Sequence, residues 1–186
     1  LDDEWLARIS GGYTDEMFAG VGGEVLYRPF AARWAVGANV NRVRQRDFNQ
    51  LFSMQDYEVT TGHLSIYYEI PWENLLAHVS VGRYLAADHG TTIDLSRRFA
   101  NGARIGAWAT FTNVSSSDFG EGSFDKGFYI YMPFDLFLPS SNRGGANFAF
   151  RPLTRDGGQK VRDGEALYFR HNTQRIENLY NSPGHI

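Results

Sequence analysis

The chain of 186 residues contains no cysteine, few prolines and no long apolar run. The absence of cysteine excludes disulfides, thiolate nucleophiles and cysteine-based zinc clusters, and it leaves no acceptor for a lipid anchor within these residues. No window holds the roughly 18 uncharged apolar residues that a membrane helix needs, so the sequence excludes a helical membrane protein. A surplus of positive charge is also missing, because 18 basic residues face 21 acidic ones. The resulting net charge of -3 argues against nucleic acid as a partner.

Aromatic residues and glycines are abundant instead. The chain holds 14 Phe, 10 Tyr, 4 Trp and 20 Gly against only 6 Pro, a profile typical of strand-rich proteins. It opens on Leu1-Asp2-Asp3-Glu4, with neither an initiator methionine nor a basic-then-apolar leader. We therefore expect a mature form or, in preference, the C-terminal part of a longer protein.

The strongest local pattern lies between residues 75 and 114. Apolar or small residues alternate there with polar ones, for example Val79 and Val81 with His78 and Ser80, which is the period of a strand. Turn-forming stretches at residues 87–90 and 100–102 divide the segment into three neighbouring antiparallel strands. Each strand exceeds the about five or six residues typical of soluble domains and approaches the roughly nine to eleven of a strand that crosses a bilayer.

The same alternation predicts strands along most of the chain. They are expected at residues 5–13, 18–28, 33–45, 57–70 and 124–134 and, more weakly, at 146–153 and 165–170. With the three central strands the total is roughly ten. We therefore predict an all-β fold, an antiparallel up-and-down (meander) transmembrane β-barrel or barrel segment. The barrel occupies residues 1–170, and an irregular tail follows in residues 171–186.

The connections between these strands differ in length on the two rims. Short ones at residues 28–31, 71–74 and 100–102 share one rim. The other rim receives residues 46–56, 87–90 and 115–123, of which the first and the last are long. This matches the periplasmic turns and extracellular loops of an outer-membrane barrel, although residues 138–145 form a long connection on the short-turn rim. An aromatic belt is expected at that rim. It comprises Tyr27, Trp34, Tyr68, Trp72, Phe99 and Phe134.

Two charged residues, Arg83 and Arg97, occupy the apolar face, and both lie close to a turn. An arginine near a bilayer interface costs only about 0 to 1 kcal/mol, since its long side chain reaches the water. The alternative is a soluble β protein in which this face is exposed to solvent.

The polar face carries the residues of functional interest. Its hydroxyl, imidazole and charged side chains can bond sugar hydroxyls or water without any catalytic step. Otherwise they are solvated or form ion pairs across strands, for which Asp94 and Arg104 are candidates. The residues predicted to line the lumen are His63, Ser65, His78, Ser80, Asp94, Ser96, Arg98, Arg104, Thr110 and Thr112.

No motif of known chemistry accompanies them. A ligand spacing such as H-E-x-x-H is missing, and the three serines at residues 115–117 lack a nucleophile-elbow pattern. We therefore predict no catalytic residue, no cofactor and no metal site. One acidic group, Asp118, Glu121 and Asp125, leaves open a calcium site or a glycosidase pair.

Four stretches carry a family resemblance. The segment FGEGSFDKGFYIYMPFD at residues 119–135, together with residues 82–102, 106–115 and 151–160, resembles the YjbH/GfcD family of outer-membrane proteins from exopolysaccharide and capsule operons. The resemblance implies an outer-membrane β-barrel with a role in secretion or assembly of an extracellular polysaccharide. It also implies a longer lipoprotein with further barrel-forming sequence upstream, and it supplies no catalytic residues. The chain departs from typical outer-membrane barrels by ending in Ser182-Pro183-Gly184-His185-Ile186 rather than in an aromatic-terminated strand.

The first hypothesis is therefore a non-enzymatic barrel segment in a Gram-negative outer membrane that takes part in polysaccharide export. Its expected partners are outer-membrane lipids, extracellular polysaccharide and other proteins of the same secretion pathway. A soluble periplasmic carbohydrate-binding β protein is the first alternative. A barrel-embedded polysaccharide hydrolase that acts through Asp118, Glu121 and Asp125 is the second.

Overall fold

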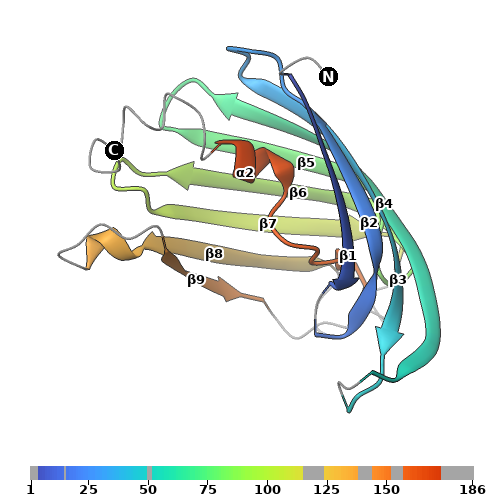
Figure 1. Cartoon of the computed structure of the whole chain (residues 1–186). Coiled ribbons are helices and arrows are strands. Elements are labelled where there is room, and N and C mark those ends of the chain that lie inside the picture. Colours follow the sequence, from blue (N-terminus) through green and yellow to red (C-terminus); the bar gives the residue numbers. More distant parts are fainter. Residues whose placement is uncertain are drawn as a thin grey trace.

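The computed structural model of the chain describes residues 4–14, 16–49, 52–114, 124–137, 144–151 and 157–172. The nine strands within these described ranges form one sheet, in which each strand pairs antiparallel with its neighbours in sequence (Figure 1). This confirms the all-β antiparallel meander that alternation predicts. The strands are β1 (Trp5–Tyr13), β2 (Phe18–Tyr27), β3 (Trp34–Arg46), β4 (Met54–Ile70), β5 (Leu75–Arg83), β6 (His89–Arg98), β7 (Arg104–Thr112), β8 (Asp125–Pro133) and β9 (Gly145–Phe150).

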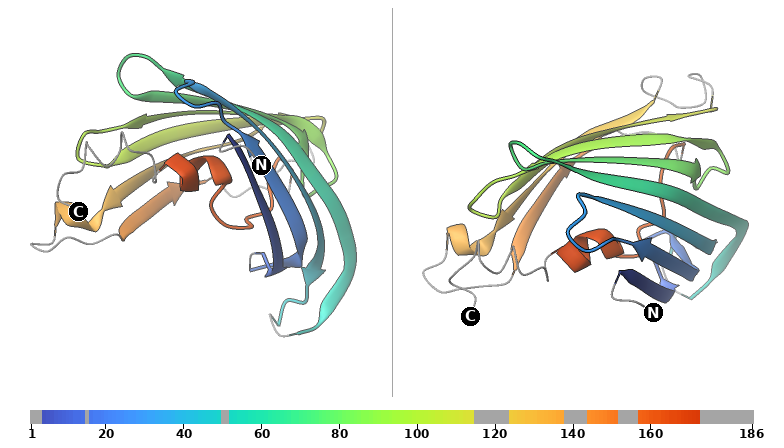
Figure 2. Two further views of the ribbon diagram at one scale, coloured as in Figure 1. Left: turned by 45° about the horizontal axis from the view of Figure 1, so that its top comes forward. Right: turned by 90° about the horizontal axis from the view of Figure 1, so that it is seen from above.

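The sheet is strongly curved, and its concave side holds the chain that follows β9 (Figures 1 and 2). A short helix η1 (Phe134–Leu136) lies between β8 and β9, and a second helix, α2 (Leu167–Asn172), lies on the concave side. Among the described residues the edge strands β1 and β9 do not pair with each other, so the sheet is not closed into a barrel. The closure expected from the sequence is therefore not seen within this chain. No helix in the described ranges is long and apolar enough to span a bilayer.

Alternation along each strand assigns the side chains to two unlike faces. On the convex face, Val79, Ile93 and Ile105 are 38%, 49% and 43% exposed. On the concave face, Ser80 and Thr110 are buried. A half-buried antiparallel sheet in a soluble domain is normally arranged the other way, with its apolar face covered and its polar face in water. The fold therefore leaves apolar surface on the outside and covers polar groups inside.

Residues 157–172, here called the returning segment, cover the concave face from one rim to the other (Figure 2). At the rim formed by the connection 84–88, the Leu85 amide donates to the Gln159 carbonyl oxygen at 2.9 Å. Toward the opposite rim, Leu167 and Tyr168 of α2 pack in a small core. The other buried members of that core are Leu26, Ala35 and Tyr67.

The strand predicted at residues 165–170 is wrong, because residues 167–170 belong to the helix α2. Phe169 and Arg170 both donate their backbone N–H to the Ala166 carbonyl oxygen, at 3.0 and 3.2 Å. The consecutive residues Leu167 and Tyr168 are both buried, whereas a strand would turn one of them away from the sheet. Six residues are too few for periodicity to separate helix from strand.

Three strand boundaries also differ from the prediction. β3 and β4 extend into residues 46–56, which alternation assigns to a loop, and the connection shrinks to residues 47–53. Next to this extension, cross-strand ion pairs on the convex side join Arg42 to Glu58 and Arg44 to Asp56. β6 begins at His89, inside the turn expected at residues 87–90.

Aromatic residues gather at the rim of the connections 28–33, 71–74 and 99–103. The Tyr27 ring centroid lies 4.7 Å from that of Trp5 and 5.9 Å from that of Trp34, and Trp34 pairs with Tyr68 across the ladder. At the same rim, Arg97 forms an ion pair with Glu73 in the turn between β4 and β5. The aromatic residues expected at this rim lie there, and Arg97 is exposed beside them.

Glycines on the concave face let neighbouring strands approach closely. A Cβ atom at Gly82 would overlap the carbonyl oxygen of Gly62 on β4, and one at Gly20 would overlap that of Arg42 on β3. Any larger residue at either position would push two strands apart, so glycine there permits the strong local bend of the sheet.

Candidate functional site

The residues predicted to line a lumen all lie on the concave face of the sheet. They come from four consecutive strands, β4 to β7, and share the inward parity of those strands. His63, Ser65 and His78 line one cavity, and Ser80 lies at its edge through a bond to Lys160. Thr110 bonds instead to Thr92 farther along the face. Whether this face lines a passage stays a prediction.

The cavity has a volume of about 150 Å³ and lies between the sheet and the returning segment. Its sheet side is formed by β1 to β5, and its other side by residues 160–169. Periodicity cannot identify the second side, because it assigns faces within a strand but does not say which distant segment covers them. The predicted set omits other lining residues, among them Arg8, Glu24, Asn39, Tyr67, Lys160, Asp163 and Phe169.

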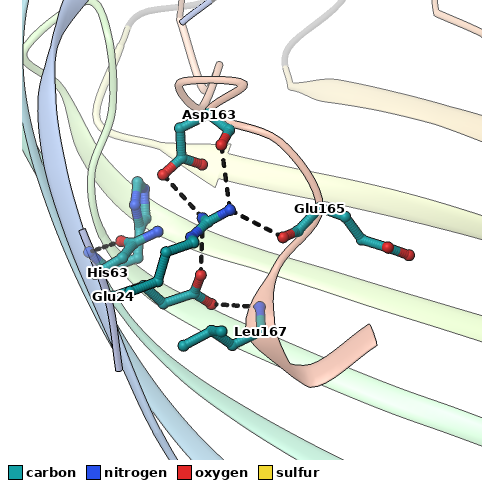
Figure 3. A network of polar contacts seen from close by, with 7 residues as sticks. Glu24, His63, Asp163, Glu165 and Leu167 are labelled. Atoms are coloured by element: carbon teal, nitrogen blue, oxygen red, sulfur yellow. Dashed lines mark hydrogen bonds and ion pairs between the residues drawn. The ribbon is translucent and has the colours of Figure 1, made fainter. Parts of the chain in front are cut away.

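Arg8 of β1 joins the sheet to the returning segment. Figure 3 labels Glu24 on the sheet and Asp163, Glu165 and Leu167 on the returning segment. The Arg8 guanidinium lies 2.8 Å from the Glu24 carboxylate and 3.0 Å from the Asp163 carboxylate, and it donates to the carbonyl oxygens of Asp163 and Glu165. Glu24 in turn accepts the Leu167 backbone N–H at 3.0 Å, at the start of α2. The Arg8 guanidinium therefore pairs with both carboxylates. Together with the bond from Leu167 to Glu24, these contacts fix the position of α2.

Aromatic stacking holds the other side of α2. The Tyr168 ring stacks on Tyr67 at 4.1 Å between centroids, and Tyr67 stacks on His78 at 4.4 Å. The Arg28 guanidinium lies 4.7 Å from the Tyr168 ring centroid, while the Tyr168 hydroxyl donates to Glu69 at 2.8 Å. The stack covers both faces of the Tyr67 ring, so that residue presents only its edge to the cavity.

The side chain of Lys160, in the returning segment, extends to the sheet. Its ammonium group donates to the Ser80 hydroxyl, and burial lowers the pKa of Lys160 to about 8, an effect that the charge of Asp94 opposes. Asp94 itself accepts a hydrogen bond from the Tyr129 hydroxyl at 3.2 Å. Within the described residues no ion pair joins Asp94 to Arg104, the pair suggested by the sequence, and the Arg104 guanidinium lies 4.6 Å from the Phe169 ring centroid.

The two cavity histidines each keep one ring nitrogen without a hydrogen bond. The Nε2 atoms of His63 and His78 are buried and have no partner among the described residues. His63 is only 5% exposed, its ring contacts Tyr84 edge to face, and its backbone N–H donates to Asn39 Oδ1 at 2.9 Å. A buried nitrogen of this kind is expected to bond water or a ligand.

Comparison with known proteins identifies the family. The chain matches, over residues 1–172, the YjbH family model, described as exopolysaccharide biosynthesis protein YbjH. The chain belongs to the YjbH family. It is 44% identical over 165 residues to the uncharacterized lipoprotein YjbH of Escherichia coli K12. The aligned region comprises 87% of this chain and 24% of that protein. The chain thus spans about a quarter of the relative's length, and no solved structure matches it.

The acidic group considered for hydrolysis lies mostly outside the described part of this YjbH-family chain. Asp118, Glu121 and the serines 115–117 fall within residues 115–123, which the structure does not describe. Asp125 is 1% exposed, accepts the Trp108 indole N–H at 3.1 Å and lies 4.0 Å from Arg151 Nε. In the described ranges no three His, Asp or Glu residues are grouped so as to hold a metal ion.

Proposed function

We propose that this YjbH-family chain is part of an outer-membrane β-barrel that acts in the secretion or assembly of an extracellular polysaccharide, without chemistry of its own. The observation that carries the proposal is the inverted sheet, with apolar side chains exposed on its convex face and polar ones covered on its concave face. Leu64, Ile66 and Val81 are each more than half exposed on the convex side. Such a continuous apolar surface is expected where lipid replaces water.

The distribution of charge on the convex face supports the same proposal. In the described strands the charged residues of this face lie toward the strand ends, as Arg42 and Lys126 do near one rim and Arg97 does near the other. The middle of each strand carries aliphatic, small or aromatic residues. A charge at the bilayer centre is disfavoured by about 2 to 4 kcal/mol, whereas one near the interface is tolerated.

The open edges of the sheet fit a chain that is one part of a barrel. β1 and β9 each have one neighbour in the described sheet, and an edge with unpaired backbone groups is not stable in hydrocarbon. Because the chain spans 24% of its E. coli relative, strands from other parts of the protein can pair with these edges. In this proposal the partners are outer-membrane lipids, the polysaccharide and other proteins of its secretion pathway.

The test uses the full-length protein in isolated outer membranes. Nitroxide labels at positions 79, 105 and 130 are expected to contact acyl chains and to be quenched by oxygen more than by a water-soluble nickel complex. A label at Thr112, on the concave parity at a strand end, is the matched control and should respond to nickel. Bulk-like aqueous mobility at the three convex positions, or full solubility of the protein without detergent, would contradict the proposal and favour a soluble periplasmic carbohydrate-binding protein.

The absence of chemistry is tested separately. Glu121→Gln and Asp125→Asn variants should leave the yield and length of the secreted polymer unchanged, since the proposal gives neither carboxylate a catalytic role. Longer polymer with normal barrel assembly would point instead to a hydrolase.

A further inference from the structure

The cavity under the returning segment combines a half-buried cation with unpaired imidazole nitrogens. It has a volume of about 150 Å³, several times the roughly 10 to 15 Å³ that one water needs by this kind of measure. From the sheet, His63 and His78 contribute the two Nε2 atoms that have no hydrogen-bond partner among the described residues. From the returning segment, Lys160 contributes its ammonium group. Polar groups thus converge on this space from both of its sides.

Of the charged groups around the cavity, the two carboxylates have an ion-pair partner and Lys160 does not, within the described residues. The carboxylates of Glu24 and Asp163 are both occupied by Arg8, at 2.8 and 3.0 Å. Lys160 bonds the neutral Ser80 hydroxyl, and in the described part of the chain no carboxylate lies within 4.0 Å of its ammonium group. An anionic ligand would therefore complete the bonding of Lys160 without displacing an existing ion pair.

We propose that this cavity binds an acidic sugar unit, whose carboxylate is held by Lys160 and His63. The ring hydroxyls would bond the remaining polar groups, His78, Asn39 and Ser65, which line the same space. A small inorganic anion would satisfy Lys160 but leave most of the volume unfilled. The inference rests on the proposed function, which supplies a polysaccharide, and it adds the class of sugar that the concave face recognises.

The probes are sodium glucuronate, glucose and inorganic phosphate, titrated against the purified full-length protein in detergent and followed by saturation-transfer NMR. Glucuronate should bind at least about 10-fold more tightly than glucose, because a charge-assisted hydrogen bond contributes about that factor or more. Lys160→Met should weaken glucuronate binding by a similar factor. Lys126→Met is the matched control, since Lys126 is exposed outside the cavity, and it should leave binding unchanged.

His63→Gln provides a second variant in case Lys160→Met does not fold. It keeps a polar group while removing the imidazole, so it should weaken glucuronate binding in a folded protein. Equal binding of glucose and glucuronate would overturn the proposal, as would unchanged binding in both cavity variants. Phosphate that displaces glucuronate with equal affinity would reduce the site to an anion site and overturn the sugar assignment.

The same preparations are tested for outer-membrane location and heat-modifiable gel mobility. An outer-membrane protein that does not bind glucuronate overturns only the sugar site. A protein that is soluble without detergent and binds glucuronate overturns only the membrane proposal.

Discussion

Lys160 shows how the returning segment places a charge inside a curved sheet. Its long side chain crosses to β5 and bonds the Ser80 hydroxyl, and the groups that face it from the neighbouring strands are His63, His78 and Asp94. Of these, Asp94 favours the charged amine, while burial disfavours it more strongly. The ammonium group is therefore held in the interior at a cost in stability that a bound anion would reduce.

That cost predicts a pH dependence of unfolding. Burial lowers the pKa of Lys160 from 10.5 to about 8, so between these values the unfolded chain binds the proton that the folded chain has released. Stability should therefore rise from about pH 8 to about pH 10.5, by at most about 3.5 kcal/mol, because one pKa unit corresponds to about 1.4 kcal/mol. The measurement is the free energy of unfolding of full-length protein against pH, compared with Lys160→Met. Parallel profiles for the two proteins would contradict it.

At the scale of residues, the sequence predicts part of the sheet side of the cavity, from β4 and β5, but not its cover. Alternation alone places His63, Ser65 and His78 on one face, because a strand turns every second side chain the same way. Arg8 lies on the polar parity of β1, but only the folded chain brings it to Asp163. Local sequence patterns do not indicate a contact between residues so far apart in the chain, so they do not predict the Arg8 network.

At the scale of elements, the helix α2 is stabilised by tertiary contacts rather than by the helix propensity of its own residues. The helix has only six residues. Its first turn contains no acidic side chain, which would stabilise the helix by interacting with its dipole. Instead, the Glu24 carboxylate accepts the Leu167 N–H, and Tyr168 packs between Tyr67 and the Arg28 guanidinium. The nine strands carry their period in their own residues, whereas α2 does not, and that difference explains why alternation predicts the strands and fails at this helix.

Removing the Tyr168 ring is therefore expected to release α2 from the concave face. Tyr168→Ala should lower the free energy of unfolding by about 3 to 5 kcal/mol, as for other large buried aromatics, and should increase hydrogen–deuterium exchange in residues 157–172. Tyr168→Phe is the matched control, because it keeps the ring that stacks on Tyr67 and removes the hydroxyl that bonds Glu69, a change of about 1 kcal/mol. Equal exchange in wild type and Tyr168→Ala would mean that the ring does not anchor the helix.

At the scale of the whole molecule, alternation and turn spacing fix which strands are neighbours and which face is apolar. They do not fix closure, because closure depends on what pairs with the outer edges of β1 and β9. The barrel expected from the sequence is thus an open sheet in this chain. Closure of the sheet does not determine whether lipid or water surrounds the convex face. Two substitutions on one strand distinguish these environments.

Ile66 and Ile70 lie on the same face of β4, Ile66 paired with Val36 and Val79 in the middle of the sheet and Ile70 at the strand's last position. In lipid, Ile66→Arg should reduce the free energy of unfolding by about 2 to 4 kcal/mol and Ile70→Arg by only about 0 to 1, because the second guanidinium reaches the interface. The measurement is unfolding of full-length protein refolded in vesicles. In water both changes would be small, within about 0.5 kcal/mol, since Ile66 is exposed and Ile70 is partly exposed at the strand end. A difference between the two variants therefore distinguishes hydrocarbon from solvent on this face, and equal small effects would place the convex side in water.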